Sequence, residues 1–393
     1  MKKLFILGAS VLQLPAILTA KKMGLHVAVA DYNSQAVGIP YADVYYNVST
    51  MDEEAICKVA KQYQPDGIMT LATDMPIRGV AMASEMLGLH SISYETAIKA
   101  TDKYSMIKAF KEHGVPSPWY YVISSIDELQ KLSEQLTFPC IIKPTDNAGS
   151  HGVVLVHGLA DLVDSYNYSR KYSRGGNIII EEFLQGKEVS VEVMVIEGNV
   201  HILQITDKLT TGAPYFVEMG HSQPVQLSEK IQIEVCKVAV GAVQAIGIDN
   251  GPAHVEMMIT VDGPIMIELG ARMGGDNITT CLLPLSTGVD MVKATINVAL
   301  GEKPDIKPRL HCGSAVRYIE APLGVIRSIS GVEEARAIAG VEQIIFTTSV
   351  GEKTFPVCCS NDRVGFVIAQ AENVDRAVEI CEKAIRMIKI DID

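Results

Sequence analysis

Short apolar runs and helical patterns alternate along the first hundred residues of the chain. Residues 4–7 and 26–30 have the pattern of buried strands, and residues 12–23 between them have the apolar spacing of a helix. The alternation continues through a helix at 52–62 and a strand that ends at Thr73-Asp74. Strands that alternate with helices predict a doubly wound α/β domain with a mostly parallel sheet.

The turns after these strands are candidate ligand sites, because open parallel sheets bind ligands beyond the carboxyl ends of their strands. Gly8, Asp31 and Asp74 occupy such positions. The turn at Gly8 lacks the second and third glycines of a G-x-G-x-x-G motif, so we expect it simply to start a helix. Residues 1–20 also resemble a secretory signal, but the completed strand–helix–strand pattern favours a folded segment.

The pattern changes near residue 101. The elements expected beyond it are a helix at 103–113, strands at 138–144, 177–184, 187–199 and 200–210, a helix at 227–246 and a hairpin at 253–269. From about residue 306 the chain has the pattern of an α+β tail. We therefore expect three domains, at residues 1–100, 101–305 and 306–393.

Two glutamates interrupt the apolar hairpin, and they are the most informative residues of the chain. Glu256 and Glu268 each lie in an otherwise apolar strand, and a buried carboxylate is costly unless it is paired, hydrogen-bonded or bound to metal. Two carboxylates on neighbouring strands, with Arg272 just beyond, could hold Mg²⁺ against the phosphates of a nucleotide. The alternative is a pair of solvated glutamates on an edge hairpin.

The turn of this hairpin decides whether both carboxylates reach the same face. A two-residue loop at Asp262-Gly263 would pair Glu268 with Met257 and place the two glutamates on opposite faces. A three-residue loop or a bulge would place both on one face. Because Pro264 fits poorly into a regular ladder, we expect the irregular arrangement.

A strand lysine followed by a polar, glycine-containing loop suits phosphate binding. Lys143 offers a positive charge, and the backbone N–H groups of Gly149, Ser150 and Gly152 can approach phosphate oxygens closely. The glycines follow the lysine, whereas those of a P-loop precede it. An ordinary hairpin loop beside a surface lysine is the alternative.

The next strand ends in a segment that suits a nucleoside. It contains Glu181, Glu182, Phe183 and Leu184, with Glu188 beyond a Gln-Gly turn. Backbone groups at a strand end can bind the edge of an adenine, and a carboxylate a few residues later can accept ribose hydroxyls. Glutamates that face solvent are the alternative.

Composition narrows the class of partner. The chain has 393 residues, of which 48% are hydrophobic and 20% charged, so a large core is expected. A net charge of −12 without a basic cluster argues against nucleic acid as the main partner. Eight cysteines without Cys-x-x-Cys spacing indicate neither a zinc site nor a disulfide framework. We expect a cytoplasmic protein, and no apolar run is long enough to predict a membrane span.

Taken in order, several motifs resemble the ATP-grasp superfamily over residues 100–290. They are Lys103, Ile-Ile-Lys143-Pro144, the Gly-Ser-His-Gly-Val loop, Glu-Glu-Phe-Leu-x-Gly-x-Glu, and the Glu256/Glu268 hairpin ending at Arg272. The resemblance implies an N-terminal doubly wound α/β domain, a two-lobed central ATP-binding region and a C-terminal α+β domain. The central part is also similar to carbamoyl-phosphate synthase large subunits, biotin carboxylases and glycinamide ribonucleotide synthetases, and the tail resembles that of L-amino acid ligases.

The resemblance also implies residue roles. It implies that Lys103, Lys143 and the 147–153 loop contact the phosphates of ATP, that residues 181–184 line an adenine pocket, and that Glu188 contacts the ribose. It also implies that Glu256 and Glu268 bind Mg²⁺ (or Mn²⁺), and that Arg272 contacts the transferred phosphoryl group. Family members often carry Asn-Pro before the arginine, where this chain has Gly270-Ala271. Asp276 or Asn277, or else water and nucleotide, would then supply the missing metal oxygen.

The resulting hypothesis is an ATP-dependent carboxylate–amine ligase that forms an amide or peptide-like bond through an acyl phosphate. An amino acid is the preferred substrate class because of the tail resemblance, and Lys208 and Arg317 are candidate anchors for a substrate carboxylate. A homodimer is plausible for the superfamily. The alternatives are an enzyme that activates bicarbonate, as biotin carboxylase or carbamoyl-phosphate synthase does, and a nucleotide-binding protein without turnover.

Overall fold

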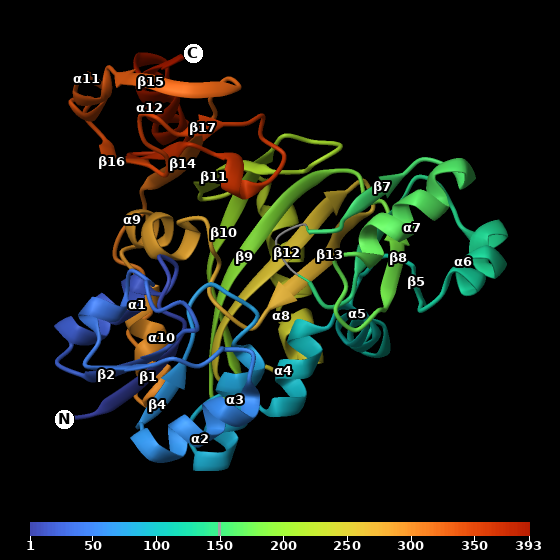
Figure 1. The fold of residues 1–393 in the computed structure, drawn as a ribbon, viewed down its shortest axis with the longest axis horizontal. Helices are drawn as coiled ribbons and strands as arrows, with labels where there is room; N and C mark the ends of the chain where they lie inside the picture. Colours follow the sequence, from blue (N-terminus) through green and yellow to red (C-terminus); the bar gives the residue numbers. More distant parts are fainter. Residues whose placement is uncertain (148–150) are drawn as a thin grey trace.

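The computed structural model describes residues 1–147 and 151–393, and it has the expected mixed α/β architecture (Figure 1). The N-terminal elements are β1 (Lys3–Leu7), α1 (Leu14–Lys22), β2 (His26–Ala30), β3 (Val44–Tyr46), α2 (Glu53–Tyr63), β4 (Gly67–Met69) and α3 (Ile77–Leu87). The strands form a parallel sheet in the order β3-β2-β1-β4. After their first residue, β1 and β2 are buried throughout, as expected for a sheet that is covered on both faces. The strand–helix–strand prediction is confirmed.

A small antiparallel sheet forms the lobe at the right of Figure 1. The elements of this lobe are β5 (Tyr120–Ile123), α6 (Ile126–Leu132), β6 (Cys140–Pro144), β7 (Val154–Val156), α7 (Leu162–Arg170) and β8 (Ile178–Glu182). Helices α4 (Tyr94–Thr101) and α5 (Lys103–Glu112) precede it and pack in the same core as α8 (Glu229–Ile246). The strands pair in the order β5-β8-β6-β7. Leu129 of α6 and Tyr166 of α7 pack on the apolar side chains of this sheet, which gives the lobe a core of its own.

A second, larger antiparallel sheet runs from the central region into the tail. Its strands are β9 (Lys187–Ile196), β10 (Asn199–Thr210), β11 (Glu218–Gln223), β12 (Gly251–Thr260), β13 (Gly263–Gly270), β14 (Gly313–Ile319), β16 (Val341–Phe346) and β18 (Gly365–Ala371). They pair in the order β13-β12-β9-β10-β11-β14-β18-β16. Helix α8 (Glu229–Ile246) packs on the central strands, where its Ala239 and Val243 share a core with Val191 and Val255. The ladder therefore continues past the domain boundary expected near residue 305.

The remaining elements follow the hairpin in sequence. They are α9 (Leu283–Thr287), α10 (Met291–Ala299), β15 (Gly324–Ser330), α11 (Val332–Arg336), β17 (Lys353–Thr354), α12 (Val374–Met387) and β19 (Lys389–Ile392). Helix α12 packs on β14 and β18 of the large sheet. Strands β17, β15 and β19 form a small separate sheet, and α10 packs against the N-terminal domain. Among the described residues, no helix combines the length and apolar character that crossing a bilayer requires.

The β12–β13 hairpin places Glu256 and Glu268 directly opposite each other. Thr260 pairs with Gly263, so the two-residue loop lies at 261–262. The two-residue loop at 262–263, which would place the glutamates on opposite faces, is therefore not the arrangement that the structure has. The two carboxylates project from the same face, because directly opposed residues of an antiparallel pair share a face.

A bulge produces this register. The ladder shifts between the Glu256–Glu268 pair and the Met257–Met266 pair, which leaves Ile267 as the extra residue of β13. The expected irregularity is confirmed, although it lies three residues beyond Pro264. Strand β13 is at the edge of the sheet, where a proline that lacks an N–H group is tolerated.

Candidate functional site

A cavity between the small sheet and the β12–β13 hairpin collects most of the residues selected from the sequence. Those lining it are Lys103, Lys143, Glu181, Glu182, Phe183, Leu184, Glu188, Glu256 and Glu268, together with Lys208, Met258 and Ile267. They come from α5, β6, β8, β9, β10, β12 and β13 and the segments beside them. Motifs that are up to 165 positions apart in sequence therefore form one site.

Glu256 and Glu268 form the acidic part of this cavity. Burial raises the pKa of Glu256, but Lys208 and His254 hold it well below its usual range. The pKa of Glu268 is also lowered, because Lys103 outweighs both burial and the neighbouring Glu256. Both side chains are ionised at neutral pH, and they present the oxygen donors that Mg²⁺ prefers.

Lys208 of β10 lies at the centre of this charge network. Its Nζ is 2.6 Å from Glu188, 2.9 Å from Glu218 and 2.8 Å from Glu256, and its side chain is 1% exposed. Lys208 therefore balances three carboxylates of the protein, and its expected role as an anchor for a substrate carboxylate stays a prediction. Arg317, the other expected anchor, donates to two backbone carbonyl groups.

Lys103 and Lys143 line the same cavity as the carboxylates. Lys103 begins α5, and its Nζ is 2.5 Å from Glu268. Lys143 lies on β6, with its Nζ 2.5 Å from Glu181 of β8. Each lysine is held by an acid of the protein at a position where phosphate oxygens would compete for the same charge.

A buried chain of hydrogen bonds that sequence reasoning missed lies behind Glu256. His254 Nε2 is 3.2 Å from Glu256 Oε1, and His254 Nδ1 is 2.9 Å from Glu192 Oε1. Burial lowers the pKa of His254, but the two carboxylates raise it to about 9. Each ring nitrogen of His254 therefore contacts a carboxylate oxygen. The available signal was the spacing of His254 and Glu256, which puts both on one face of a strand.

Arg272 connects the site to the N-terminal domain. Its Nε is 2.9 Å from Asp74 Oδ1 and its Nη2 is 3.0 Å from Asp74 Oδ2. Asp74 follows β4, at one of the positions selected from the sheet topology. A second cavity contains this pair together with Lys103, Glu256 and Glu268, so the guanidinium group lies beside the two carboxylates.

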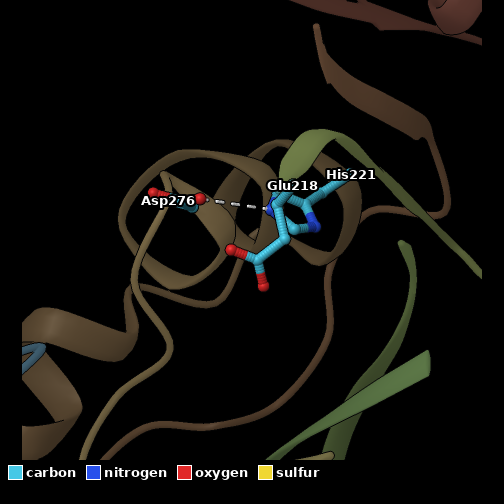
Figure 2. A group of neighbouring side chains, drawn as sticks. All are labelled: Glu218, His221 and Asp276. Carbon is cyan, nitrogen blue, oxygen red and sulfur yellow. Dashed lines mark ion pairs between the residues drawn. The ribbon is translucent and has the colours of Figure 1, made fainter. Parts of the chain in front are cut away.

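A further polar cluster lies at the border with the tail. Figure 2 shows Glu218, His221 and Asp276, whose possible ligand atoms lie within 4.8 Å of one another. Arg363 binds both oxygens of Asp276, at 2.7 and 3.0 Å, and His221 Nε2 lies 3.6 Å from Asp276 Oδ2. The cluster could hold a cation or an ammonium group. Asp276, one expected source of a metal oxygen, is instead paired with Arg363.

The glycine-containing loop is described in part. Gly149 and Ser150, both expected to contact phosphate, lie outside the described residues. Gly152 has a φ of +81°, and a Cβ there would lie 2.9 Å from the Cβ of Tyr172. Glycine is therefore favoured at position 152 by its backbone conformation and by its packing.

Two protein families match parts of this chain. The ATP-grasp domain family matches residues 136–280, and L-amino acid ligase C-terminal domain 2 matches residues 317–393. Alanine–anticapsin ligase of Bacillus subtilis is 28% identical over 64% of this chain, but the match spans only 58% of that protein. A formate-dependent phosphoribosylglycinamide formyltransferase of Saccharolobus solfataricus is 24% identical over 99% of this chain and 97% of its own length. In fold, the chain is similar to an L-amino acid ligase from Bacillus licheniformis, with a TM-score of 0.86 and 24% sequence identity. The superposition covers 100% of this chain and 99% of that ligase.

Proposed function

We propose that the protein is an ATP-dependent carboxylate–amine ligase, because residues 136–280 match the ATP-grasp domain family and residues 317–393 match L-amino acid ligase C-terminal domain 2. Its substrates would be Mg-ATP, a carboxylate and an amine, with an amino acid among them. The observation that carries this proposal is the direct opposition of Glu256 and Glu268 in a cavity that also contains Lys103 and Lys143.

The cavity has separate regions for the parts of a nucleotide. Met258 and Ile267 supply apolar surface for a base, and the backbone of Phe183 and Leu184 continues beyond the end of β8. Glu188 lies past the following turn, where ribose hydroxyls would be in reach. The phosphates would then extend toward the lysines and the two opposed glutamates.

Glu256 and Glu268 fit a magnesium ion because they are ionised, adjacent and offer oxygen donors. When bound, Mg²⁺ neutralises phosphate oxygens and holds them for transfer. Gly270 offers no side-chain oxygen, and Asp276 is paired with Arg363. The two glutamates therefore supply the protein's share of the metal ligands in this proposal.

The reaction follows from this arrangement. An oxygen of the substrate carboxylate attacks the γ-phosphorus of ATP, ADP leaves, and an acyl phosphate forms. The amine then attacks the acyl carbon, the C–O bond to phosphate breaks, and an amide remains. Lys103, Lys143 and Arg272 offset the charge of the transferred group, so the protein contributes mainly position and electrostatics.

The substrate amino acid would lie next to the nucleotide cavity, between the central region and the tail. The neighbouring cavity is lined by Glu218, Arg272 and Asp276 together with tail residues such as Cys359. This placement is supported by the match of the tail to the L-amino acid ligase C-terminal domain. Charged groups of both signs suit the ammonium and carboxylate groups of an amino acid.

Phosphate release from Mg-ATP tests the proposal across amino acids, singly and in pairs, with formate and bicarbonate as separate additions. Release that requires one carboxylate and one amine supports the ligase. Release that requires bicarbonate supports a carboxylase, and release with formate supports the chemistry named for the full-length relative. Glu268→Ala is the inactive control, because it removes one proposed metal ligand.

A further inference from the structure

Glu256, a ligand of the proposed metal site, contacts the buried residue His254, and His254 in turn contacts the buried residue Glu192. Glu192 of β9 and His254 of β12 are paired residues of the ladder. Glu192 also accepts a hydrogen bond from Ser190, at 3.1 Å. Glu192 is 0% exposed and His254 is 4% exposed, so water does not compete for their contact.

The packing around this pair leaves little freedom. A Cβ at Gly274 would lie 2.7 Å from His254 Nδ1 and 2.8 Å from Glu192 Oε2. The backbone that follows Arg272 therefore closes directly on the imidazole and its carboxylate. A buried charged pair is costly unless its geometry is well fixed, and this close packing fixes it.

We propose that His254 is a positioning residue that orients the carboxylate of Glu256 toward Mg²⁺, with Glu192 orienting the imidazole. This inference rests on the proposed function, because that function assigns the metal to Glu256. His254 Nε2 lies 3.2 Å from Oε1 of Glu256, and Lys208 donates to Oε2 at 2.8 Å. Contacts from two different strands thereby set the plane of the carboxylate.

The contacts leave Glu256 able to bind a metal. An ionised carboxylate offers about four lone-pair sites, and the two hydrogen bonds use two of them. Hydrogen-bond partners of metal ligands typically change metal affinity by about 10–100-fold when they are removed. His254 is expected to contribute through orientation, without touching the substrate or the metal.

Manganese binding tests this role independently of catalysis. Mn²⁺ is titrated into protein saturated with ADP, and the free ion is measured by electron paramagnetic resonance. We expect His254→Ala to weaken Mn²⁺ binding by about 10–100-fold and to leave the affinity for metal-free ADP unchanged. His254→Gln keeps one N–H donor and should restore part of the Mn²⁺ affinity.

Two further variants separate positioning from folding. The double variant Glu192→Gln/His254→Gln replaces the buried charged pair with two neutral amides, so that no buried carboxylate is left without a partner. We expect this double variant to weaken Mn²⁺ binding as well. Val255→Ala is the matched control, because Val255 lies on the same strand and packs in the α8 core. It should lower stability while Mn²⁺ affinity stays at the wild-type value.

Glu256→Gln distinguishes failure of this inference from failure of the proposed function. If Glu256→Gln abolishes Mn²⁺ binding while folded His254→Ala and the double variant bind Mn²⁺ as tightly as wild type, the positioning role is overturned and the function stands. If wild-type protein with ADP takes up no Mn²⁺, the proposed function fails and this inference fails with it.

Discussion

At the scale of single residues, the site is organised by buried charges that satisfy one another. Lys208 is surrounded by Glu188, Glu218 and Glu256, and burial lowers its pKa less than these carboxylates raise it. The lysine is therefore charged at neutral pH. Its removal would leave three acids without their common cation.

Lys208→Met retains most of the side-chain volume but removes this cation. Breaking a buried ion pair from one side costs about 3–5 kcal/mol, so we expect a loss of that order in the free energy of unfolding, together with loss of Mg-ATP binding. Urea denaturation and calorimetric titration measure the two effects.

Lys187→Met is the control for this prediction. The side chain of Lys187 is 42% exposed and pairs with Asp207 at the surface, and such pairs contribute about 0–1 kcal/mol. If both variants lost the same free energy of unfolding and the same affinity for Mg-ATP, the central role given to the buried charge of Lys208 would be contradicted.

Because of Asp276, we expect the free energy of unfolding to depend on pH in the acid range. Burial raises its pKa, but His221 and Arg363 hold the pKa well below its ordinary value. Such a carboxylate stabilises the fold above its unfolded pKa of about 3.9, and the stabilisation is lost as pH falls through the lower folded pKa. Asp276→Asn should therefore be less stable than wild type at neutral pH.

The difference in unfolding free energy between Asp276→Asn and wild type should shrink as the pH falls below about 4. Chemical denaturation at a series of pH values measures it. A difference that stays constant from neutral to acid pH would show that the variant acts through packing and not through the charge of Asp276.

Sequence reasoning found the residues whose charge conflicts with their apolar surroundings. Glu256 and Glu268 stand out because each interrupts an apolar strand. The pairing of Arg272 with Asp74 joins residues 198 positions apart, and local patterns carry no information about that distance. His254 was missed for the same reason, because its other partner, Glu192, belongs to a different strand.

At the scale of elements, the strands with a clear apolar pattern were predicted from the sequence, and a strand without such a pattern was not. Strands β1 and β2 are apolar after their first residue, and their bounds agree with the prediction within one residue. Strand β11 was not expected, because Glu-Met-Gly-His-Ser-Gln has no apolar alternation, although its last four residues are buried. Gln223 at its end donates to Thr206 and accepts from Ser286, each at 2.9 Å. Hydrogen bonds replace apolar packing in this strand.

Gln223→Leu tests this account of β11. The substitution removes both hydrogen-bonding groups and leaves the Thr206 and Ser286 hydroxyls without this partner in a buried place. A buried polar group that loses its partner costs about 1–3 kcal/mol, so we expect a lower midpoint in urea denaturation. If the apolar substitution proved neutral or stabilising, the hydrogen bonds would not be what holds this strand.

At the scale of the whole molecule, the Arg272–Asp74 pair couples the N-terminal domain to the site. Asp74→Ala should leave the arginine less well placed, and a misplacement of about 1 Å can lower turnover by about a hundredfold. We expect kcat to fall while the KM for ATP changes little, because the nucleotide contacts lie on other elements. Steady-state kinetics measure both. Asp66→Ala is the control, because Asp66 binds the backbone of Lys3 at the opposite end of the parallel sheet.

The general architecture was predictable from the ordered motifs, but the course of the large sheet was not. Strand β11 pairs with β14 across a long stretch of chain, and such pairing depends on tertiary packing. The expected domain boundaries stay a prediction. What the tail adds to the site, through Arg363 and its pairing with Asp276, likewise depends on this long-range arrangement.

The shared sheet also limits how such a chain can acquire a new tail. Residues Gly220 to Gln223 are hydrogen-bonded in register with Ser314 to Arg317, so the tail is not a detachable module joined by a linker. A recombinant that exchanges the tail must bring a strand that fits this ladder, or it leaves an open sheet edge that invites aggregation. New substrate preferences are therefore more accessible through substitutions in loops around the cavities than through shuffling of whole domains.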